Sequence, residues 1–239
     1  MTKKALVIQH DHVSPPGPVG ARLAERGYDV ELLQLIDETD FHDPGVSVEL
    51  PEATAYDVIV PMGAIWSAYD EELIGSWLLP ELDLLRAADA AGVAVLGICF
   101  GGQLLSIAHG GRVSPSPRPE LGWVQVEADE PDLVPSGPWF QWHNDRWSLP
   151  AGAREIARND AASQAWVLRR NLALQFHPEL TADMLEGWLS NGGAAAVVAH
   201  GQDVEQLRAV TAGEDAAARR RAGALVDAFL DRVASSPLS

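Results

Sequence analysis

The sequence predicts an α/β protein built on a doubly wound, mostly parallel sheet. Two observations support this fold class. Over the first 108 residues, short apolar segments that look like buried strands alternate with longer segments of helical character. Glycine closes the helical segments, as at Gly27 and Gly92, and a glycine just past the last helical turn is a common stop signal.

The expected elements can be placed in chain order. The parallel strands are expected at residues 5–9, 30–33, 57–61, 93–98 and 172–176. The helices between them are expected at residues 19–26, 71–91 and 101–108, the second despite Pro80. Because open sheets of this kind build their sites at the carboxyl ends of the strands, the residues that follow residues 61, 98 and 176 are the first candidates for function.

The sequence changes character after the third helix. Short alternating segments between Gly122 and Gln175 predict a small antiparallel β extension beside the main sheet. Five tryptophans fall in this region, and core or edge packing is the expected role of most of them. Residues 193–239 are rich in Ala, Arg and acidic residues with helical spacing of Leu225 and Phe229, which predicts a helical appendage packed by one face. The expected division is therefore a main domain, 1–192, and a C-terminal helical extension, 193–239.

Cys99 is the only cysteine and lies between Gly97 and Gly101. An apolar strand leads into this segment and a helix follows, so the pattern predicts a tight strand–turn–helix elbow that presents the sulfur. The positive end of the helix favours the thiolate, which is the nucleophilic form. A lone cysteine is also often only a small core residue, so the elbow needs a second observation.

His177 supplies that observation. It follows the apolar segment 172–176, and Glu179 stands two residues later. In extended backbone, residues i and i+2 project to the same face, and Pro178 restrains His177 to extended conformations. We therefore expect Glu179 to orient the imidazole and His177 to exchange protons with Cys99. Cys99 would then be the nucleophile, His177 the base and Glu179 the orienting acid.

These segments resemble the class I, triad-type glutamine amidotransferases. The resemblance extends from about residue 4 to residue 189 and rests on GICFGGQLL, QFHPE, PSPRPELGWVQV and QWHNDRWSLP. The last segment is similar to stand-alone proteins close to the amidotransferase domain of GMP synthase. The resemblance implies a flavodoxin-like sheet and a catalytic role for Cys99, His177 and Glu179.

The same resemblance implies further site residues. Gly63 and Phe100 would offer backbone amides as an oxyanion hole. Substrate contacts are expected from Gln103, His143, Asn144 and Asp145. The chain departs from the family where VPMGA replaces the usual Gly-Gly-Pro, where WHND replaces WHGD, and at Gly102, which hints at a roomier pocket.

The function expected from these residues is hydrolysis of the side-chain amide of L-glutamine through a γ-glutamyl thioester. By resemblance, the ammonia would pass to a synthetase partner, because the chain has no nucleotide-binding glycine motif of its own. Two other functions stay open. One is a γ-glutamyl peptidase or hydrolase that acts on γ-glutamyl peptides or conjugates, and the other is a non-catalytic binding or regulatory module. The resemblance implies that Glu120 lies near the site, and a structural salt bridge with Arg118 stays equally open.

Composition restricts the partners. The net charge of −17 makes binding to a nucleic-acid backbone unfavourable. No apolar run approaches the ~20 residues of a membrane span, and the N-terminal apolar stretch is too short for a signal peptide. A single cysteine rules out an internal disulfide and fits a cytoplasmic protein. His10 and His12 flank Asp11, but we interpret them as polar loop residues, and no metal or cofactor is expected.

Overall fold

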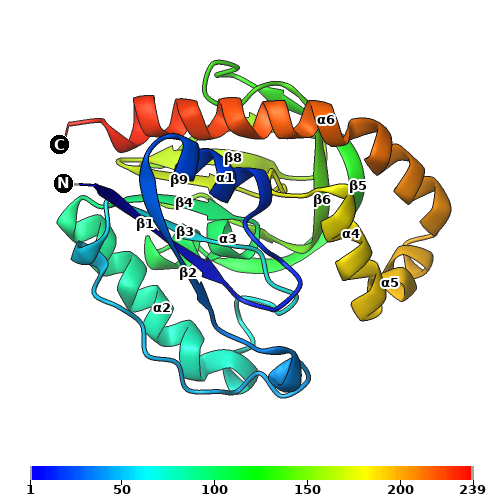
Figure 1. Cartoon of the computed structure of the whole chain (residues 1–239), viewed down its shortest axis with the longest axis horizontal. Helices are drawn as coiled ribbons and strands as arrows, with labels where there is room; N and C mark the ends of the chain where they lie inside the picture. The colour runs from blue at the N-terminus through cyan, green and yellow to red at the C-terminus, as the bar shows by residue number, and fades with distance from the viewer. Residues whose placement is uncertain (1, 238–239) are drawn as a thin grey trace.

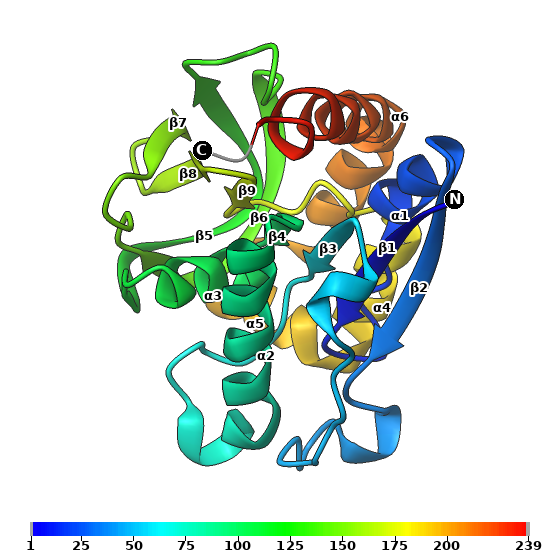
Figure 2. The same cartoon turned by 90° about the vertical axis from the view of Figure 1, so that its left-hand side faces the viewer.

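The computed structural model describes residues 2–237 and contains one nine-stranded mixed sheet with helices on both faces (Figures 1 and 2). The strands are β1 Lys3–Gln9, β2 Tyr28–Gln34, β3 Val58–Pro61, β4 Ala94–Ile98, β5 Val113–Ala128, β6 Gly137–Trp147, β7 Arg154–Arg158, β8 Ser163–Leu168 and β9 Asn171–Leu174. The longer helices are α1 Gly17–Glu25, α2 Glu71–Ala91, α3 Phe100–Ala108, α4 Ala182–Trp188, α5 Ala194–Ala199 and α6 Val204–Ala228. The short helical segments are η1 Glu38–Asp40, η2 Ala53–Ala55, η3 Leu189–Gly193 and η4 Phe229–Ala234.

The strand order is β2-β1-β3-β4-β9-β8-β7-β5-β6. The strands β2, β1, β3, β4 and β9 pair in parallel. Successive side chains of a strand point to opposite faces, and both faces of β1, β3, β4 and β9 are covered. As a result, β1, β3, β4 and β9 are almost wholly buried, which is why the sequence shows them as unbroken apolar segments.

The expectation of a mostly parallel sheet with a small antiparallel extension is wrong. Strands β9, β8, β7, β5 and β6 pair in antiparallel fashion, so four of the eight strand pairings are parallel and four are antiparallel. The antiparallel strands continue the same sheet, and β5 alone has 16 residues. Its first half contains three prolines and a register shift between Pro115 and Glu120. This irregularity breaks the alternating pattern that would have marked a long strand.

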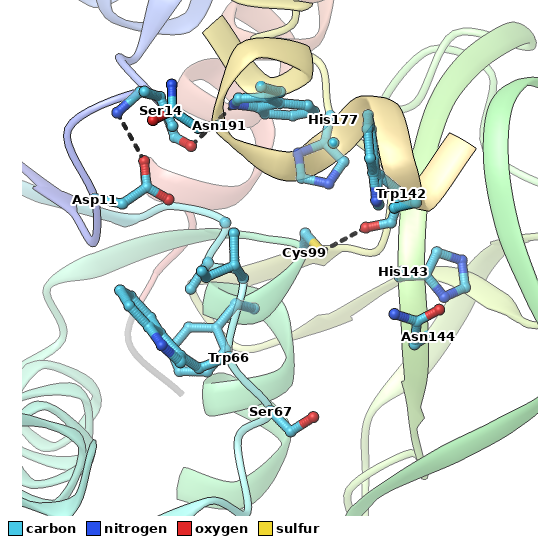
Figure 3. Close-up of a pocket in the computed structure, with 18 of the residues that line it drawn as sticks. Asp11, Ser14, Trp66, Ser67, Cys99, Trp142, His143, Asn144, His177 and Asn191 are labelled. Atoms are coloured by element: carbon cyan, nitrogen blue, oxygen red, sulfur yellow. Dashed lines mark hydrogen bonds between the residues drawn. The ribbon is translucent and has the colours of Figure 1, made fainter. Parts of the chain in front are cut away.

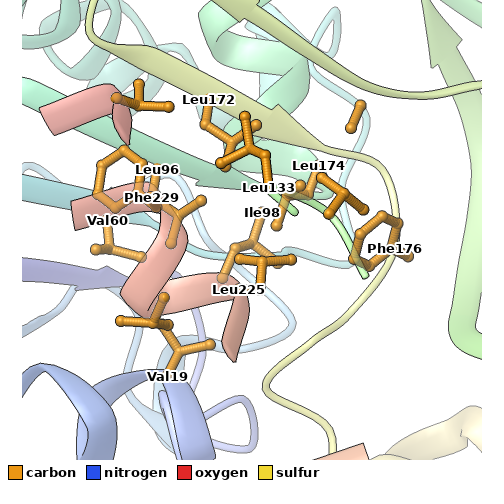
Figure 4. Close-up of a cluster of buried hydrophobic side chains, with 14 of the residues drawn as sticks. Val19, Val60, Leu96, Ile98, Leu133, Leu172, Leu174, Phe176, Leu225 and Phe229 are labelled. Atoms are coloured by element: carbon orange, nitrogen blue, oxygen red, sulfur yellow. The ribbon is translucent and has the colours of Figure 1, made fainter. Parts of the chain in front are cut away.

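Two apolar clusters fix the helices to the sheet. On one face, Leu6, Ile59 and Val95 pack with side chains of α2 and α3, such as Trp77 and Leu104. On the other face, the opposite sides of the same strands pack with α1 and the C-terminal helix in the cluster drawn in Figure 4, which includes Val19, Val60, Leu96, Leu225 and Phe229. This arrangement holds the carboxyl ends of β3, β4 and β9 in fixed positions.

The expected helix at residues 71–91 matches α2 at both ends. Other boundaries differ by a few residues, for example 19–26 against Gly17–Glu25 for α1. The C-terminal helix is longer than its apolar spacing indicated and runs across the molecule (Figure 1). Besides its apolar contacts, it is fixed to α1 by Arg22, whose guanidinium donates two hydrogen bonds of 2.9 and 2.6 Å to the Asp227 carboxylate.

Candidate functional site

Cys99 lies in a sharp turn between β4 and α3. Its φ of 50° and ψ of −105° are in a region that L residues rarely adopt. Gly97 and Gly101 make the turn possible. A Cβ on Gly97 would lie 2.6 Å from the carbonyl oxygen of Gly101, and a Cβ on Gly101 would collide with the carbonyl oxygen of Pro61. The backbone of the turn is also tied to its neighbours, since Cys99 N–H donates to Leu174 O over 2.7 Å. The predicted elbow is therefore present.

His177 and Glu179 are in contact, as predicted, but not in the predicted conformation. The distance from His177 Nδ1 to Glu179 Oε1 is 2.8 Å. Strand β9 ends at Leu174, and residues 177–180 form a turn that is closed by a hydrogen bond from Leu180 N–H to His177 O. The turn, rather than an extended strand, brings the carboxylate to the ring. Both side chains are buried, Glu179 completely, so the carboxylate holds the imidazole without competition from water.

The sulfur of Cys99 and the imidazole of His177 lie in one pocket, with the ring facing the thiol (Figure 3). Gly63 lies next to both residues. A Cβ placed on Gly63 would be 2.9 Å from His177 Cε1 and 3.8 Å from Cys99 Cβ. Burial lowers the pKa of His177, but the charges of Cys99 and Glu179 outweigh burial and hold this pKa well above 6.5. The imidazole Nε2 has no hydrogen-bond partner among residues 2–237. It is therefore free to exchange a proton in the pocket.

Two backbone amides adjoin the sulfur. Phe100 N–H is at the first turn of α3, where helical amides have no partner within the helix. Gly63 follows the end of β3 and Met62. Within the described residues, neither the Gly63 amide nor the Phe100 amide donates to a backbone carbonyl, whereas the next amide, Gly101 N–H, donates to Met62 O over 3.0 Å. Both amides are thus available to a negatively charged oxygen beside Cys99.

The pocket around Cys99 has a volume of about 380 Å³. It is lined by eight residues named from the sequence, Gly63, Cys99, Phe100, Gln103, His143, Asn144, Asp145 and His177. Glu179 lies behind His177 and does not line the pocket. Four aromatic side chains form much of the remaining wall, namely Phe41, Trp66, Trp142 and Trp188. The resulting surface is mainly apolar with a few polar groups.

The expected substrate contacts differ in their availability. Asn144 is exposed and free to reach into the pocket. The side chains of the other three are occupied in the structure. Gln103 Nε2 donates to Asp145 O over 3.4 Å, and the ring of His143 contacts the same carbonyl oxygen and Glu120 Oε2, at 2.9 and 3.0 Å. The Asp145 carboxylate accepts hydrogen bonds from Ser67 and Tyr69.

Glu120 belongs to a buried polar network and not to the pocket wall. Its carboxylate accepts hydrogen bonds from Asn159 Nδ2 at 2.6 Å and Gln164 Nε2 at 2.8 Å, in addition to its contact with His143. Glu120 thus lies near the site, next to the pocket residue His143, and among the described residues Arg118 does not pair with it. The network fixes the strand β6 that carries Asn144 and Asp145.

Gly102 does not enlarge the pocket. A Cβ placed on it would lie 2.8 Å from Leu174 O and 3.0 Å from the ring of Trp147. The residue therefore faces β9 and the core, where it allows α3 to approach the sheet. The hint of a roomier pocket from this position is wrong, because position 102 lies on the side of the helix turned away from the pocket.

The segment His10–Asp11 is part of the site region and not a polar loop. His10 and Asp11 are completely buried. Asp11 lines the pocket, where Oδ1 accepts from Val13 N–H at 2.9 Å and Oδ2 has no partner among residues 2–237. Burial raises the pKa of the Asp11 carboxyl. Its position directly after β1, at the carboxyl edge of the sheet, is the signal that could have identified it from sequence.

Comparison with known proteins agrees with this geometry. Residues 21–191 match the family described as glutamine amidotransferase class-I. The chain belongs to the class I glutamine amidotransferase family. A crystal structure of a glutamine amidotransferase from Methylobacillus flagellatus superposes with a TM-score of 0.83 at 30% identity, covering 97% of this chain and 95% of that one.

Two curated relatives indicate the range of the family. A GMP synthase (glutamine-hydrolyzing) from Thermomicrobium roseum is 38% identical over 131 residues, 51% of this chain and 23% of that protein. A γ-glutamyl-L-1-hydroxyisopropylamide hydrolase from a Pseudomonas species is 29% identical over 173 residues, 65% of this chain and 57% of that protein. The matched part thus spans less than two thirds of either relative. Among residues 2–237, the helices include none that is long and apolar enough to cross a membrane.

Proposed function

We propose that the protein hydrolyses the side-chain amide of a γ-glutamyl compound, most simply L-glutamine, with Cys99, His177 and Glu179 as its catalytic triad. The observation that carries the proposal is the strained elbow of Cys99 facing a buried imidazole that Glu179 contacts at 2.8 Å. Strain of this kind persists only where the surrounding structure enforces it, and it is concentrated at functional sites. Membership of the amidotransferase family supports the same chemistry.

The reaction would proceed in two steps. The Cys99 thiolate attacks the amide carbon, and the amides of Gly63 and Phe100 bind the oxyanion that forms. His177, held as imidazolium by the charges of Cys99 and Glu179, donates its proton to the leaving nitrogen, so that the C–N bond breaks and ammonia departs. A water molecule then attacks the thioester carbon while His177 takes its proton, and the C–S bond breaks to release glutamate.

Asp11 supplies a recognition group for this substrate. A γ-glutamyl compound carries an α-ammonium group, and the pocket offers the Asp11 carboxylate, whose Oδ2 lacks a partner among residues 2–237 and is turned toward the pocket (Figure 3). A buried carboxylate gains most from a cation that bonds to it directly. We therefore place the substrate ammonium at Asp11, on the opposite side of Cys99 from Trp142 and Asn144.

A specific observation favours a second candidate, hydrolysis of a γ-glutamyl conjugate. Trp66, Trp142 and Trp188 line a pocket of about 380 Å³, and an apolar wall of this kind stabilises apolar substituents rather than free ammonia. The relative named as a γ-glutamyl-L-1-hydroxyisopropylamide hydrolase acts, by its name, on such a conjugate. For the first candidate, the GMP synthase relative supports transfer of the ammonia to a synthetase partner.

The purified protein, with Cys99→Ser as a control, distinguishes the two candidates. It is incubated with L-glutamine and with γ-glutamyl amides that carry methyl, isopropyl and benzyl groups, and ammonia or amine release is measured. A kcat/KM that is highest for glutamine supports the glutaminase, and one that rises with the size of the apolar group supports the conjugate hydrolase. Turnover of none of these substrates by the chain alone or with synthetase subunits would favour a binding module.

We also propose that residues 1–192 form the amidotransferase domain and residues 193–239 a C-terminal extension, of which residues 193–237 pack on the domain and residues 238–239 lie outside the described part of the chain. Leu225 and Phe229 are completely buried in the same apolar cluster as Val60 and Leu96. The alignment with the Methylobacillus protein over 97% of this chain supports the view that the extension is integral to the fold.

A further inference from the structure

Glu81 is a completely buried carboxylate in the middle of α2. Its two oxygens lie 3.0 and 3.2 Å from Nε2 of His10, which is also completely buried at the end of β1. Burying an acid and a histidine costs free energy that an apolar pair of the same size would not cost. The pair is therefore a candidate for a role other than packing.

The second nitrogen of His10 reaches the site. His10 Nδ1 lies 3.1 Å from the carbonyl oxygen of Gly63. The same ring contacts the Phe100 ring edge to face, with 4.9 Å between centroids. Gly63 and Phe100 are the two residues whose amides we assign to the oxyanion hole. One buried imidazole thus contacts both of them from behind, on the side away from the substrate.

The partners of His10 determine its charge. A carboxylate and a carbonyl oxygen only accept hydrogen bonds, so both ring nitrogens must donate, and only the imidazolium has two N–H groups. Burial lowers the pKa of His10, but the charge and hydrogen bond of Glu81, the hydrogen bond to Gly63 O and the charge of Asp11 together outweigh burial and raise this pKa above 6.5. With Glu81 ionised, the His10 ring is an imidazolium that contacts the two residues we assign to the oxyanion hole.

We propose that the Glu81–His10 pair is a positioning pair for the oxyanion hole. His10 fixes the Gly63 carbonyl and with it the orientation of the Gly63 segment, and Glu81 keeps the ring protonated and in place. His10 does not touch the substrate and acts through Gly63 and Phe100. The inference rests on the proposed function, because it takes Cys99 as the nucleophile.

Two reactions of Cys99 separate this role from a purely structural one. With p-nitrophenyl acetate, the thiolate attacks the carbonyl carbon, an oxyanion forms, and the C–O bond breaks to release p-nitrophenolate with its electron pair. With iodoacetamide, the thiolate displaces iodide at a saturated carbon, and no oxyanion forms. Only the first reaction needs the oxyanion hole, and neither needs the natural substrate.

The experiment compares both rates in the wild type, His10→Ala, His10→Asn, Glu81→Gln and the control His109→Asn, which changes a histidine at the other end of α3. We expect His10→Ala to release the Gly63 segment and to slow acylation about 100-fold, as misplacement of a catalytic group by about 1 Å does. Alkylation should change by less than about twofold, because no oxyanion forms in that reaction. His10→Asn keeps a donor for Gly63 O and should recover much of the acylation rate, and Glu81→Gln should fall between the wild type and His10→Ala.

Equal losses in both reactions would overturn the proposal, since they would show a general disturbance of Cys99. Unchanged acylation in His10→Ala would also overturn it. If His10→Ala does not fold, the ratio of the acylation rate to the alkylation rate in Glu81→Gln and His10→Asn provides the test. A lower ratio in Glu81→Gln than in the wild type supports the proposal, and an unchanged ratio overturns it. A wild type that hydrolyses no γ-glutamyl compound but shows the expected ratios would refute the proposed substrate and leave the positioning pair intact.

Discussion

Replacement of Gly63 by alanine tests the geometry of the site most directly. The new Cβ would be 2.9 Å from His177 Cε1, whereas ordinary contacts begin at 3.4 Å. The imidazole, held at its other side by Glu179, would have to retreat by about 0.5 Å. The φ of Gly63 is not in the left-handed region, so alanine adds this contact without adding backbone strain.

The expected result is a large loss of rate with little loss of stability. Misplacement of a catalytic group by about 1 Å costs about 100-fold in rate, so a shift of half that size should lower kcat/KM by about 10-fold or more, about 1.4 kcal/mol of transition-state free energy. Release of ammonia or amine measures the rate, and urea unfolding measures stability. Gly213→Ala, on α6 with open space around it, is the matched control. A Gly63→Ala variant with wild-type kcat/KM would refute the assignment of Gly63 and His177 to one reaction centre.

Three further predictions follow from named contacts. Asp11→Asn should raise KM for a γ-glutamyl substrate by about 10-fold or more with a smaller change in kcat, since an ion pair is lost; an unchanged KM would move the ammonium site elsewhere. Glu179→Gln removes one of the charges that hold the pKa of His177 high. Activity that depends on the His177 imidazolium is present below the pKa of His177 and is lost as pH rises through it. The alkaline fall in kcat/KM should therefore move to lower pH in Glu179→Gln. A fall at the same pH as in the wild type would count against a role for the His177–Glu179 contact. Phe229→Ala should lower the free energy of unfolding by about 3–5 kcal/mol, measured by urea titration, and a loss under about 1 kcal/mol would show that the C-terminal helix is peripheral.

The sequence predicts the parallel part of the fold and the turn at Cys99 well because each is encoded locally. Gly97 and Gly101 are required by the close approach of two backbone segments, and that requirement leaves a visible pattern around Cys99. The apolar segments of β1, β3 and β4 are equally local, because burial on both faces demands apolar residues throughout.

Other features depend on partners that are distant in sequence. Glu81 looks like one more acidic residue of an amphipathic helix, and its burial follows only from His10, 71 residues earlier. The turn at His177 is likewise set by tertiary contacts, including a hydrogen bond from its N–H to Phe140 O on β6. The extent of the antiparallel strands was missed because β5 begins with a proline-rich, irregular half.

The position of β9 has a consequence for how the molecule reaches activity. Strand β9 pairs with β8 across a connection of two residues, but its other neighbour, β4, is paired through Ile98 and Leu174, 76 residues apart. Hairpins close in microseconds, whereas pairings between distant segments form slowly. In refolding from urea, far-ultraviolet circular dichroism should therefore recover before the proposed hydrolysis does, because the thiol and the imidazole meet only when these two strands join.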